Sequence, residues 1–268
     1  MVSRILLPNT TISVSRLSFG TGSLHHLFSS KSRHALLAAA ADLGVTHFDT
    51  SPYYGYGLAE CDIGRFMLRQ RGNFTLTTKI GLYPFGPPST HITTVLCRKL
   101  FGAVFPRLSL PEVNMSVDFA RLSFYRSLKR LKTHYVDFLL LHEPLANLLD
   151  TDEMVAWLEG EKHNGRLRYW GVAGLMNNIS SFVFSGNPIA SVVQTKDSLD
   201  QRQADFLLSM DRDLQFTYGY MSGNRARLPV AMHLEIIQAA LARNTTGSLI
   251  FSSRSLNHVQ QLSKLRCP

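Results

Sequence analysis

The sequence predicts an α/β fold, namely a (β/α)8 barrel with a short N-terminal β-hairpin. Apolar runs of strand length alternate with helical patterns along the chain, which is typical of a parallel sheet covered by helices. Eight such strand–helix units within 268 residues favour a closed barrel over an open doubly wound sheet. No G-x-G-x-x-G follows the first strand, which argues against a Rossmann fold. Because no linker interrupts the chain, we expect residues 1–268 to form one domain.

Turn and cap signals define the elements of the first third of the chain. Residues 3–7 and 11–16 flank the turn at Pro8, Asn9 and Thr10, which predicts the hairpin. A strand that ends in glycines comes next, and an Ala- and Leu-rich helix follows it. The predicted barrel strands here are 17–22, 45–50 and 73–81, and the predicted helices between them are 32–43 and 58–70.

A long, proline-rich segment at 82–112 interrupts the alternation. Its length predicts a functional loop, with a short helix around residues 93–105. A helix at 114–132 and a buried strand at 134–144 then resume the pattern. The remaining predicted strands are 166–175, 190–195, 214–220 and 247–253, and the remaining predicted helices are 151–164, 178–184, 200–208, 230–244 and 257–265.

The composition is that of an ordinary globular protein, with 45% hydrophobic and 18% charged residues. The N-terminus has no unbroken apolar core of a signal peptide, and no stretch reaches the length of a membrane span. We therefore expect no membrane association. Cys61, Cys97 and Cys267 form no metal-binding or disulfide pattern, which favours free thiols in the cytoplasm.

The net charge of +9 raises the question of a nucleic-acid partner. The basic residues are scattered along the chain, however, and no recognised nucleic-acid module accompanies them. We therefore expect no nucleic-acid partner, because a basic balance equally suits an anionic cofactor or substrate. A basic surface with exposed loops is also compatible with a monomer, which is the state we expect.

Four polar residues lie at or just beyond the ends of three successive predicted strands. Asp49 follows the second strand and Tyr54 comes five residues later, while Lys79 and His142 close the third and fourth strands. In a (β/α)8 barrel the reactive groups lie at these carboxyl ends. Each residue alone has a structural explanation, such as a turn brace or a lysine that reaches solvent. Their joint occurrence on three successive strands predicts an active site.

Carbonyl reduction requires this set of groups. A carbonyl carbon that receives hydride leaves negative charge on its oxygen, which must then be given a proton. A tyrosine has an ordinary pKa of about 10 and is a poor acid at neutral pH by itself, so we expect Lys79 to lower the pKa of Tyr54. Asp49 would keep Lys79 charged, and a neutral His142 would orient the carbonyl and donate to its oxygen.

The same residues resemble the active-site tetrad of the aldo-keto reductase superfamily. The matching motifs are FGTG (19–22), GVTHFDTSPYYGYGLAE (44–60), TTKIG (77–81) and LLLHEP (139–144). GYGLAE is most similar to the branch of aldose and L-galactose dehydrogenases and bacterial pyridoxal reductases. The resemblance implies a (β/α)8 barrel with NAD(P)H-dependent carbonyl reductase activity. It also implies Tyr54, rather than its neighbour Tyr53, as the proton donor.

On the cofactor side the resemblance is mixed. Relatives carry Ser and Asn where this chain has Ala173 and Gly174, and Gly and Asn where it has Ser252 and Leu262. The segment after Tyr220 is also shorter than in many relatives, which predicts weak cofactor binding. We expect NADP(H), with NAD(H) as the alternative, because Arg254 and Ser255 match the positions that bind the 2′-phosphate. The cofactor-binding residues that the resemblance implies are Gly20, Thr21, Gly22, Asp49, Gly174, Gln194, Tyr218, Ser252, Arg254, Ser255 and Gln261.

The leading functional hypothesis is an NADP(H)-dependent oxidoreductase that reduces an aldehyde or ketone and reversibly oxidises an alcohol or sugar. The alternative is a nucleotide-binding regulatory or accessory protein on the same barrel with little turnover. The departures on the cofactor side favour this alternative, whereas the intact tetrad argues against it. A phosphate-sugar isomerase is a third hypothesis, but the chain lacks the expected Gly-rich phosphate loop. The partner that we expect is a small-molecule carbonyl or alcohol substrate.

Overall fold

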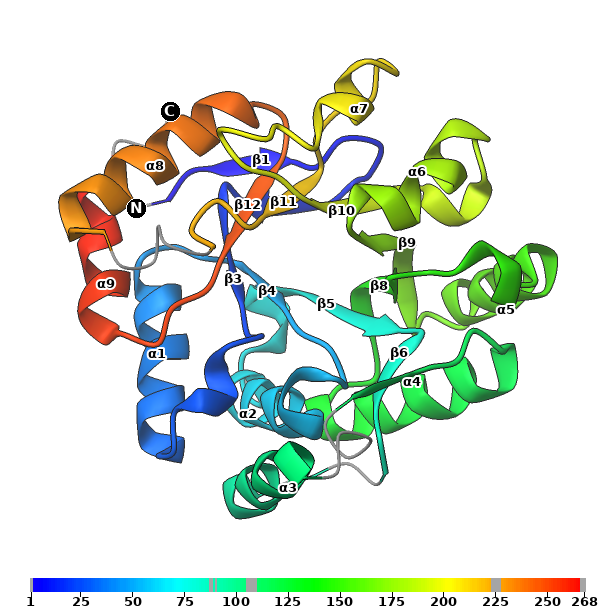
Figure 1. Ribbon diagram of the computed structural model, residues 1–268, viewed down its shortest axis with the longest axis horizontal. Helices are drawn as coiled ribbons and strands as arrows, with labels where there is room; N and C mark the ends of the chain where they lie inside the picture. Colours follow the sequence, from blue (N-terminus) through cyan, green and yellow to red (C-terminus); the bar gives the residue numbers. More distant parts are fainter. Residues whose placement is uncertain (1, 87–88, 90, 105–109, 223–227, 266–268) are drawn as a thin grey trace.

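A computed structural model describes residues 2–86, 89, 91–104, 110–222 and 228–265 of the chain. Parallel strands form a closed barrel, with helices around it (Figure 1), which confirms the predicted fold class. Around the barrel the strand order is β10-β11-β12-β3-β4-β5-β8-β9. The strands are β3 (Leu17–Gly20), β4 (His47–Asp49), β5 (Thr75–Ile80), β8 (Val136–His142), β9 (Leu167–Gly174), β10 (Val192–Lys196), β11 (Phe216–Tyr218) and β12 (Ser248–Phe251).

The helices of the outer layer lie within a few residues of the predicted positions, except that α7 is much shorter than expected. The main helices are α1 (Ser30–Asp42), α2 (Leu58–Met67), α4 (Val117–Leu131), α5 (Thr151–His163), α6 (Met176–Phe184), α7 (Asp205–Leu208), α8 (Val230–Arg243) and α9 (Leu256–Gln261). Side-chain caps begin several of them. Ser29 accepts a hydrogen bond from Ser32 at the start of α1, and Asp150 accepts one from Glu153 at the start of α5.

The N-terminal hairpin closes one end of the barrel interior. Strands β1 (Arg4–Leu6) and β2 (Ser13–Ser15) pair antiparallel, as predicted. The buried Leu7, Ile12 and Val14 pack in one cluster with apolar side chains of the barrel strands, among them Phe138 and Phe216. Burial of this apolar surface fixes the hairpin on the barrel. The barrel itself closes where β12 pairs with β3, and the buried Arg16 donates there to the carbonyl oxygens of Leu241 and Gly247.

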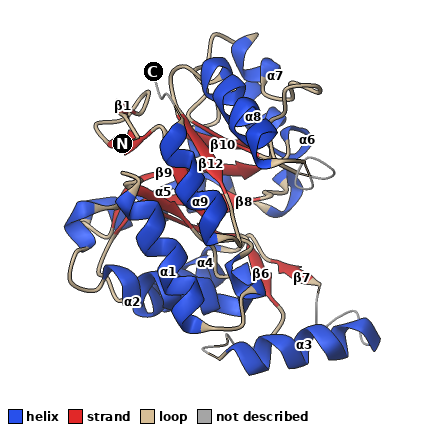
Figure 2. Cartoon of the chain, turned by 90° about the vertical axis from the view of Figure 1, so that its left-hand side faces the viewer, coloured by secondary structure: helices blue, strands red, loops and turns tan. Residues whose placement is uncertain are grey.

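The segment after β5 is more regular than the predicted loop. Strands β6 (Leu82–Pro84) and β7 (Pro111–Val113) form an antiparallel pair, and α3 (Ile92–Val104) lies between them in the chain. Figure 2 shows α3 projecting from the body of the barrel. Its inner face is nevertheless anchored, because Val95 packs against Tyr56 and Leu58. The expected short helix is therefore confirmed. The pair of β6 and β7 was not predicted, because each strand has only three residues and contains a proline, which leaves no alternating apolar pattern to recognise.

The barrel interior contains a histidine that is fully buried. The His47 ring stacks on Phe216 at 4.8 Å between centroids, and its two nitrogens lie 2.8 and 3.1 Å from the hydroxyls of Thr75 and Thr77. Burial lowers the pKa of His47 from 6.5 to about 3, with smaller contributions from Lys79 and Arg71. The imidazole is therefore neutral and serves as a core residue that joins β4, β5 and β11.

Two of the cysteines are free thiols, as expected: Cys61 is buried on α2 and Cys97 is exposed on α3. Cys267 lies outside the described residues. Within the part of the chain that the structure describes, no helix is both long enough and apolar enough to cross a bilayer.

Candidate active site

The carboxyl ends of β4, β5 and β8 bring the predicted tetrad into one pocket. Asp49 ends β4, Lys79 is the penultimate residue of β5, and His142 ends β8. Tyr54 follows β4 at the start of a short 3-10 helix. All four side chains line the same cavity of about 330 Å³. The closed barrel creates this proximity, because parallel strands present their carboxyl ends at one rim.

A buried ion pair lies at the base of the pocket. Lys79 Nζ lies 2.7 and 2.8 Å from the two oxygens of Asp49, and it also donates to the carbonyl oxygen of Thr50 at 3.0 Å. Both side chains are almost completely excluded from solvent. Burial raises the pKa of Asp49 and lowers that of Lys79, while each charge opposes the shift of the other. The bidentate contact holds the ammonium group in one place.

Tyr54 reaches this ion pair with its phenolic oxygen. Lys79 Nζ lies 3.4 Å from Tyr54 Oη, and it also lies 4.9 Å from the centroid of the ring. The expected lowering of the Tyr54 pKa is wrong for this structure. Burial raises that pKa well above 10, and the charges of Asp49 and Glu143 add to the shift. Because Asp49 already neutralises Lys79, the phenol keeps its proton, which is the form that a proton donor needs.

An unusual backbone turn presents Tyr54 to the pocket. The next three residues, Gly55, Tyr56 and Gly57, all have positive φ angles of 60°, 57° and 92°. A side chain at Gly55 would place its Cβ 2.6 Å from the Cβ of His25, so this position requires glycine. Tyr56 is strained in this conformation. The turn reverses the chain between β4 and α2 and leaves Tyr54 facing the cavity.

His142 is the third polar group around the phenol. Its ring meets the Tyr54 ring edge-on at 5.9 Å between centroids, and its Nδ1 lies 3.5 Å from Ser51 Oγ. Burial lowers the pKa of His142 well below 6.5, and Lys79 adds to the shift. The imidazole is therefore neutral, so one of its nitrogens can donate a hydrogen bond to a carbonyl oxygen in the pocket.

A second carboxylate supports Lys79 from behind the sheet. Glu60 is fully buried at the start of α2, where it accepts 2.6 Å hydrogen bonds from Thr78 Oγ1 and from Arg130 Nε. Burial lowers the pKa of Lys79, and the charge of Glu60 opposes this shift to a smaller extent than that of Asp49. The sequence analysis did not assign Glu60 a role, although it ends the motif GYGLAE. Buried carboxylates with two charge-assisted partners hold neighbouring strands and helices in fixed register.

The cofactor side of the pocket contains an unpaired polar atom. Besides Asp49, six of the predicted cofactor-binding residues line the cavity, namely Gly20, Gly22, Gly174, Gln194, Tyr218 and Ser252. The Gln194 side chain hydrogen-bonds to Asp49, while its Oε1 is buried and has no partner among the described residues. A buried amide oxygen without a protein donor is uncommon in native proteins, and it is available to accept a hydrogen bond from a ligand group or from water. A primary carboxamide, such as that of a nicotinamide, would supply the missing N–H.

A second cavity of about 310 Å³ continues the first one and shares Met221, Ile237, Phe251 and Ser252 with it. Arg254 and Ser255 line this second cavity, together with Leu262. It also contains two residues that the sequence analysis missed, His233 on α8 and His258 on α9, whose rings meet edge-on at 5.4 Å. The basic and hydroxyl groups here fit an anionic group such as a phosphate.

Two of the predicted cofactor residues line neither cavity. The side chain of Thr21 is buried, and its hydroxyl donates to the carbonyl oxygen of Asp49 at 3.0 Å. Gln261 donates to Asn257 instead. Ser252 also uses its hydroxyl within the protein, because it donates to the Gly20 carbonyl oxygen at 2.8 Å. The segment after Tyr220, which we expected to be shorter than in relatives, includes residues 223–227, which lie outside the described residues.

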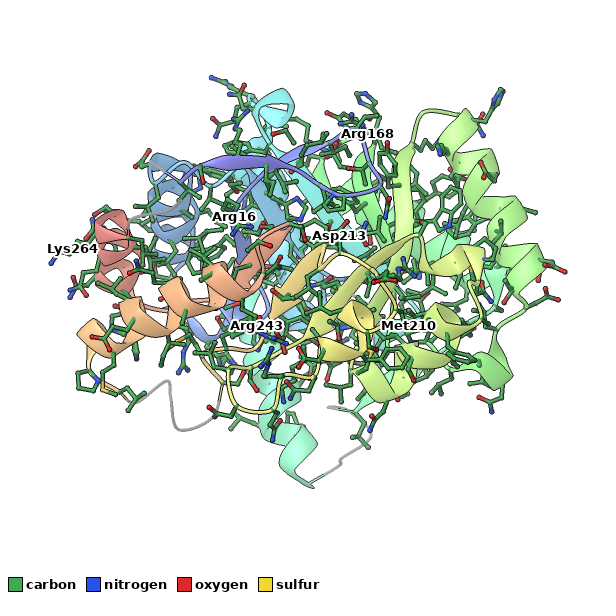
Figure 3. The ribbon with its side chains drawn as sticks, turned by 90° about the horizontal axis from the view of Figure 1, so that it is seen from above. Arg16, Arg168, Met210, Asp213, Arg243 and Lys264 are labelled. Carbon is green, nitrogen blue, oxygen red and sulfur yellow. The ribbon has the colours of Figure 1, made fainter. Side chains whose placement is uncertain are left out.

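A charged network supports the rim of the pocket near Tyr218. Arg243, labelled at the end of α8 in Figure 3, donates to Asp197 Oδ2 at 2.6 Å and to Asp205 at 2.7 Å. Tyr220 donates to the same Asp197 carboxylate at 2.6 Å. Asp197 is fully buried, and the Arg243 and Tyr220 hydrogen bonds lower its pKa against the effect of burial. The network therefore fixes the Tyr218–Tyr220 stretch above β10.

The model of the Aldo/keto reductase family matches residues 16–181 of this chain. The chain belongs to that family. The L-galactose dehydrogenase of Arabidopsis thaliana is 28% identical over 194 residues, which are 69% of this chain and 53% of that protein. The chain spans about half the length of the curated relatives it matches.

Solved structures of other aldo-keto reductases share the fold. One from Bacillus halodurans superposes with a TM-score of 0.77 at 19% identity, covering 98% of this chain and 90% of that chain. One from Klebsiella pneumoniae in complex with NADPH superposes with a TM-score of 0.66 at 17% identity, covering 98% and 89%. The family match ends inside α6, so β10, β11 and β12 of this aldo/keto reductase lie beyond it.

Proposed function

We propose that this aldo/keto reductase is an NADP(H)-dependent oxidoreductase that reduces an aldehyde or ketone and reversibly oxidises an alcohol or sugar. The observation that carries the proposal is the contact of Lys79 with both Asp49 and Tyr54 in one cavity. A neutral histidine and a protonated phenol beside a buried ammonium group suit the polarisation and protonation of a carbonyl oxygen. Membership of the family supports the same reaction.

In the proposed mechanism each tetrad residue has one task. The hydride for the carbonyl carbon would come from NADPH when it is bound. As the C=O π bond breaks, its electron pair moves onto oxygen, and Tyr54 Oη gives that oxygen its proton. Lys79 stabilises the phenolate that results, and Asp49 keeps Lys79 in place. His142 donates a hydrogen bond that orients the carbonyl. Solvent then reprotonates Tyr54, and alcohol oxidation follows the reverse steps.

The proposed cofactor side follows the two connected cavities. Gln194 would accept from the nicotinamide carboxamide through its unpaired Oε1, and Tyr218 would stack on the ring. Arg254 and Ser255 would hold the 2′-phosphate of NADP(H). The Klebsiella pneumoniae aldo-keto reductase contains NADPH, which supports this choice over NAD(H).

A small aldehyde, sugar or sugar-like alcohol is the proposed substrate class. The similarity to an L-galactose dehydrogenase supports it. The hairpin β6–β7 and helix α3 lie over the turn that presents Tyr54, because Ser89 N donates to the Tyr56 carbonyl oxygen and Val95 packs on Tyr56. We therefore propose that the 82–113 segment contributes to substrate selection.

The test is NADPH oxidation with a panel of carbonyl compounds, comparing the wild type with Tyr54→Phe and Tyr53→Phe. We expect turnover to fall about 10²–10⁴-fold in Tyr54→Phe, because phenylalanine has no hydroxyl group that could donate the proton. Tyr53→Phe is the matched control and should retain near wild-type turnover. Equal turnover of Tyr54→Phe and wild type would sink the assignment of Tyr54.

The second candidate function is a nucleotide-binding regulatory or accessory protein with little turnover. Ala173 and Gly174 favour it, because neither offers a side-chain hydrogen bond to a ligand. The same assay discriminates between the two candidates. Saturable NADPH binding without turnover across the panel, in the wild type as in Tyr54→Phe, would support the regulatory function. A cytoplasmic monomer with one domain and no nucleic-acid partner stays a prediction.

A further inference from the structure

Glu143 lies immediately after His142 and takes an uncommon backbone conformation. Its φ angle is 49°, in the left-handed region, which few residues other than glycine adopt. The backbone N–H of Glu143 donates to the carbonyl oxygen of Ala173 at 2.7 Å. This bond ties the end of β8 to β9 and turns the side chain of Glu143 toward the start of α6.

The carboxylate of Glu143 occupies a defined place at the N-terminus of α6. It accepts hydrogen bonds from the backbone N–H of Leu175 at 3.0 and 3.2 Å and from Asn178 Nδ2 at 2.7 Å. These donors are neutral. Among the described residues, no lysine, arginine or histidine forms an ion pair with Glu143, so none of these side chains neutralises its charge.

Glycine at position 174 allows this arrangement. A Cβ on Gly174 would lie 2.6 Å from Glu143 Oε2 and 3.0 Å from its Cδ, closer than atoms approach without displacement. Gly174 itself lines the main cavity. The carboxylate of Glu143 is therefore separated from the pocket by the thickness of one glycine backbone.

The pocket lining has no other net charge. Its charged residues among the described ones are Asp49 and Lys79, which neutralise each other. His142 is neutral because its pKa lies well below 6.5. After burial, which is the largest cause, the charge of Glu143 contributes to the raised pKa values of both Tyr54 and Tyr218. Its field thus reaches two aromatic side chains that line the cavity.

We propose that Glu143 sets the redox preference of the pocket by stabilising the oxidised, positively charged nicotinamide over the reduced, neutral one. The inference rests on the proposed function, because it assumes that the nicotinamide enters this cavity. Glu143 is half-buried, so the effective dielectric around its carboxylate lies between that of water and that of the protein interior, and a carboxylate held there still attracts a cation on the other side of Gly174. Gly174 is the residue that permits this close approach. Because Glu143 favours the oxidised form of the bound nicotinamide, it shifts the equilibrium in the pocket towards hydride donation, which is the direction of carbonyl reduction.

The experiment measures dissociation constants for NADP⁺ and NADPH by fluorescence or calorimetry. In Glu143→Gln the amide keeps the shape of the side chain and can still accept from Leu175, but the charge is gone. We expect the ratio Kd(NADP⁺)/Kd(NADPH) to rise about 5- to 10-fold over the wild type, as loss of one unit charge near the ring predicts. A change of less than 2-fold would overturn the inference.

Asp150→Asn is the matched control, because Asp150 is also a capping carboxylate, at the start of α5, but unlike Glu143 it contributes to the pKa of neither Tyr54 nor Tyr218. We expect its ratio to equal that of the wild type, and an equal shift in both variants would overturn the inference. Asn178→Lys is a second variant that keeps Glu143 and adds an ammonium group beside it. We expect this variant to shift the ratio in the same direction as Glu143→Gln, and an unchanged ratio would count against the proposal.

The result separates this inference from the proposed function. Failure of the wild type to bind either nucleotide would overturn both. Binding of both nucleotides by the wild type, with turnover and an unchanged ratio in Glu143→Gln, would overturn the redox role of Glu143 alone.

Discussion

The two sides of the pocket differ in how completely their polar groups are satisfied. On the tetrad side, Lys79 contacts Asp49, Thr50 and Tyr54, and every contact is made within the protein. On the cofactor side, Gln194 Oε1 has no partner among the described residues, and Arg254 is exposed. The tetrad is thus preorganised for chemistry, whereas the cofactor side leaves its polar groups available for a ligand.

The family match divides the molecule in the same way. It covers the strands that carry the tetrad and stops before β10. The tetrad side is therefore the part of the pocket that the family match covers, whereas the strands β10, β11 and β12 of the proposed cofactor side lie beyond it. If the two sides differ in this way, substitutions on the tetrad side should mainly lower the stability of the fold, and substitutions on the cofactor side should mainly lower the affinity for nucleotide.

Lys79→Met should have the largest effect, because it leaves the carboxylate of Asp49 buried without its cation. We expect a loss of about 3–5 kcal/mol in the free energy of unfolding, measured by urea denaturation. Arg65→Met is the control, since Arg65 is 44% exposed in its ion pair with Asp62 and should cost less than about 1 kcal/mol. A similar small loss in both variants would mean that the tetrad side is not a stability element.

His47→Gln should change how stability depends on pH. The pKa of His47 is about 3 in the folded protein and 6.5 in the unfolded chain, so the unfolded state binds more protons between these values. Stability should therefore fall as pH drops below 6.5, and the His47 contribution amounts to about 2 kcal/mol between pH 7 and pH 5. In His47→Gln this part of the slope should disappear; an unchanged slope would show that the ring is not buried in its neutral form.

Arg254→Gln should affect the cofactor side alone. Loss of a charge-assisted contact to a phosphate predicts an increase of about 10- to 100-fold in the Kd of NADPH, with the Kd of NADH unchanged. Stability should stay within about 0.5 kcal/mol, because Arg254 is exposed. Lys264→Gln, which removes an exposed cation outside the cavity, should leave both dissociation constants unchanged. Equal weakening of NADPH and NADH by Arg254→Gln would refute a contact to the 2′-phosphate.

Gln194→Leu should have the smallest effect. We expect about a 5- to 10-fold increase in the Kd of both NADPH and NADH, because one hydrogen bond to the carboxamide is lost. Stability should fall by about 0.5–1.5 kcal/mol, because the hydrogen bond of the Gln194 side chain to Asp49 is lost, whereas its Oε1 has no partner among the described residues to lose. Gln215→Leu offers the contrast, because the Gln215 amide bonds to Val193 and Pro8 and its loss should cost about 1–3 kcal/mol. A larger loss of stability in Gln194→Leu than in Gln215→Leu would contradict the proposed difference between the two sides of the pocket.

The sequence alone determined the barrel and the tetrad. Alternating strands and helices predict the parallel sheet, and the position of a residue at a strand end predicts which rim it reaches. Asp49, Lys79 and His142 therefore converge without any knowledge of loop geometry. The cavity-lining positions of Gln194, Tyr218, Arg254 and Ser255 also follow from the motifs.

Only the tertiary structure decided the contacts between distant segments. It placed Glu60 behind Lys79, turned Thr21 and Gln261 away from the cavities, and paired β6 with β7 across α3. It also reversed the expected direction of the Tyr54 pKa shift, because burial and the pairing of Lys79 with Asp49 outweigh the attraction of the ammonium group. The close contact between Glu143 and Gly174 is likewise visible only in the tertiary structure. Such effects depend on distances of a few ångströms between residues far apart in the chain, which no local pattern encodes.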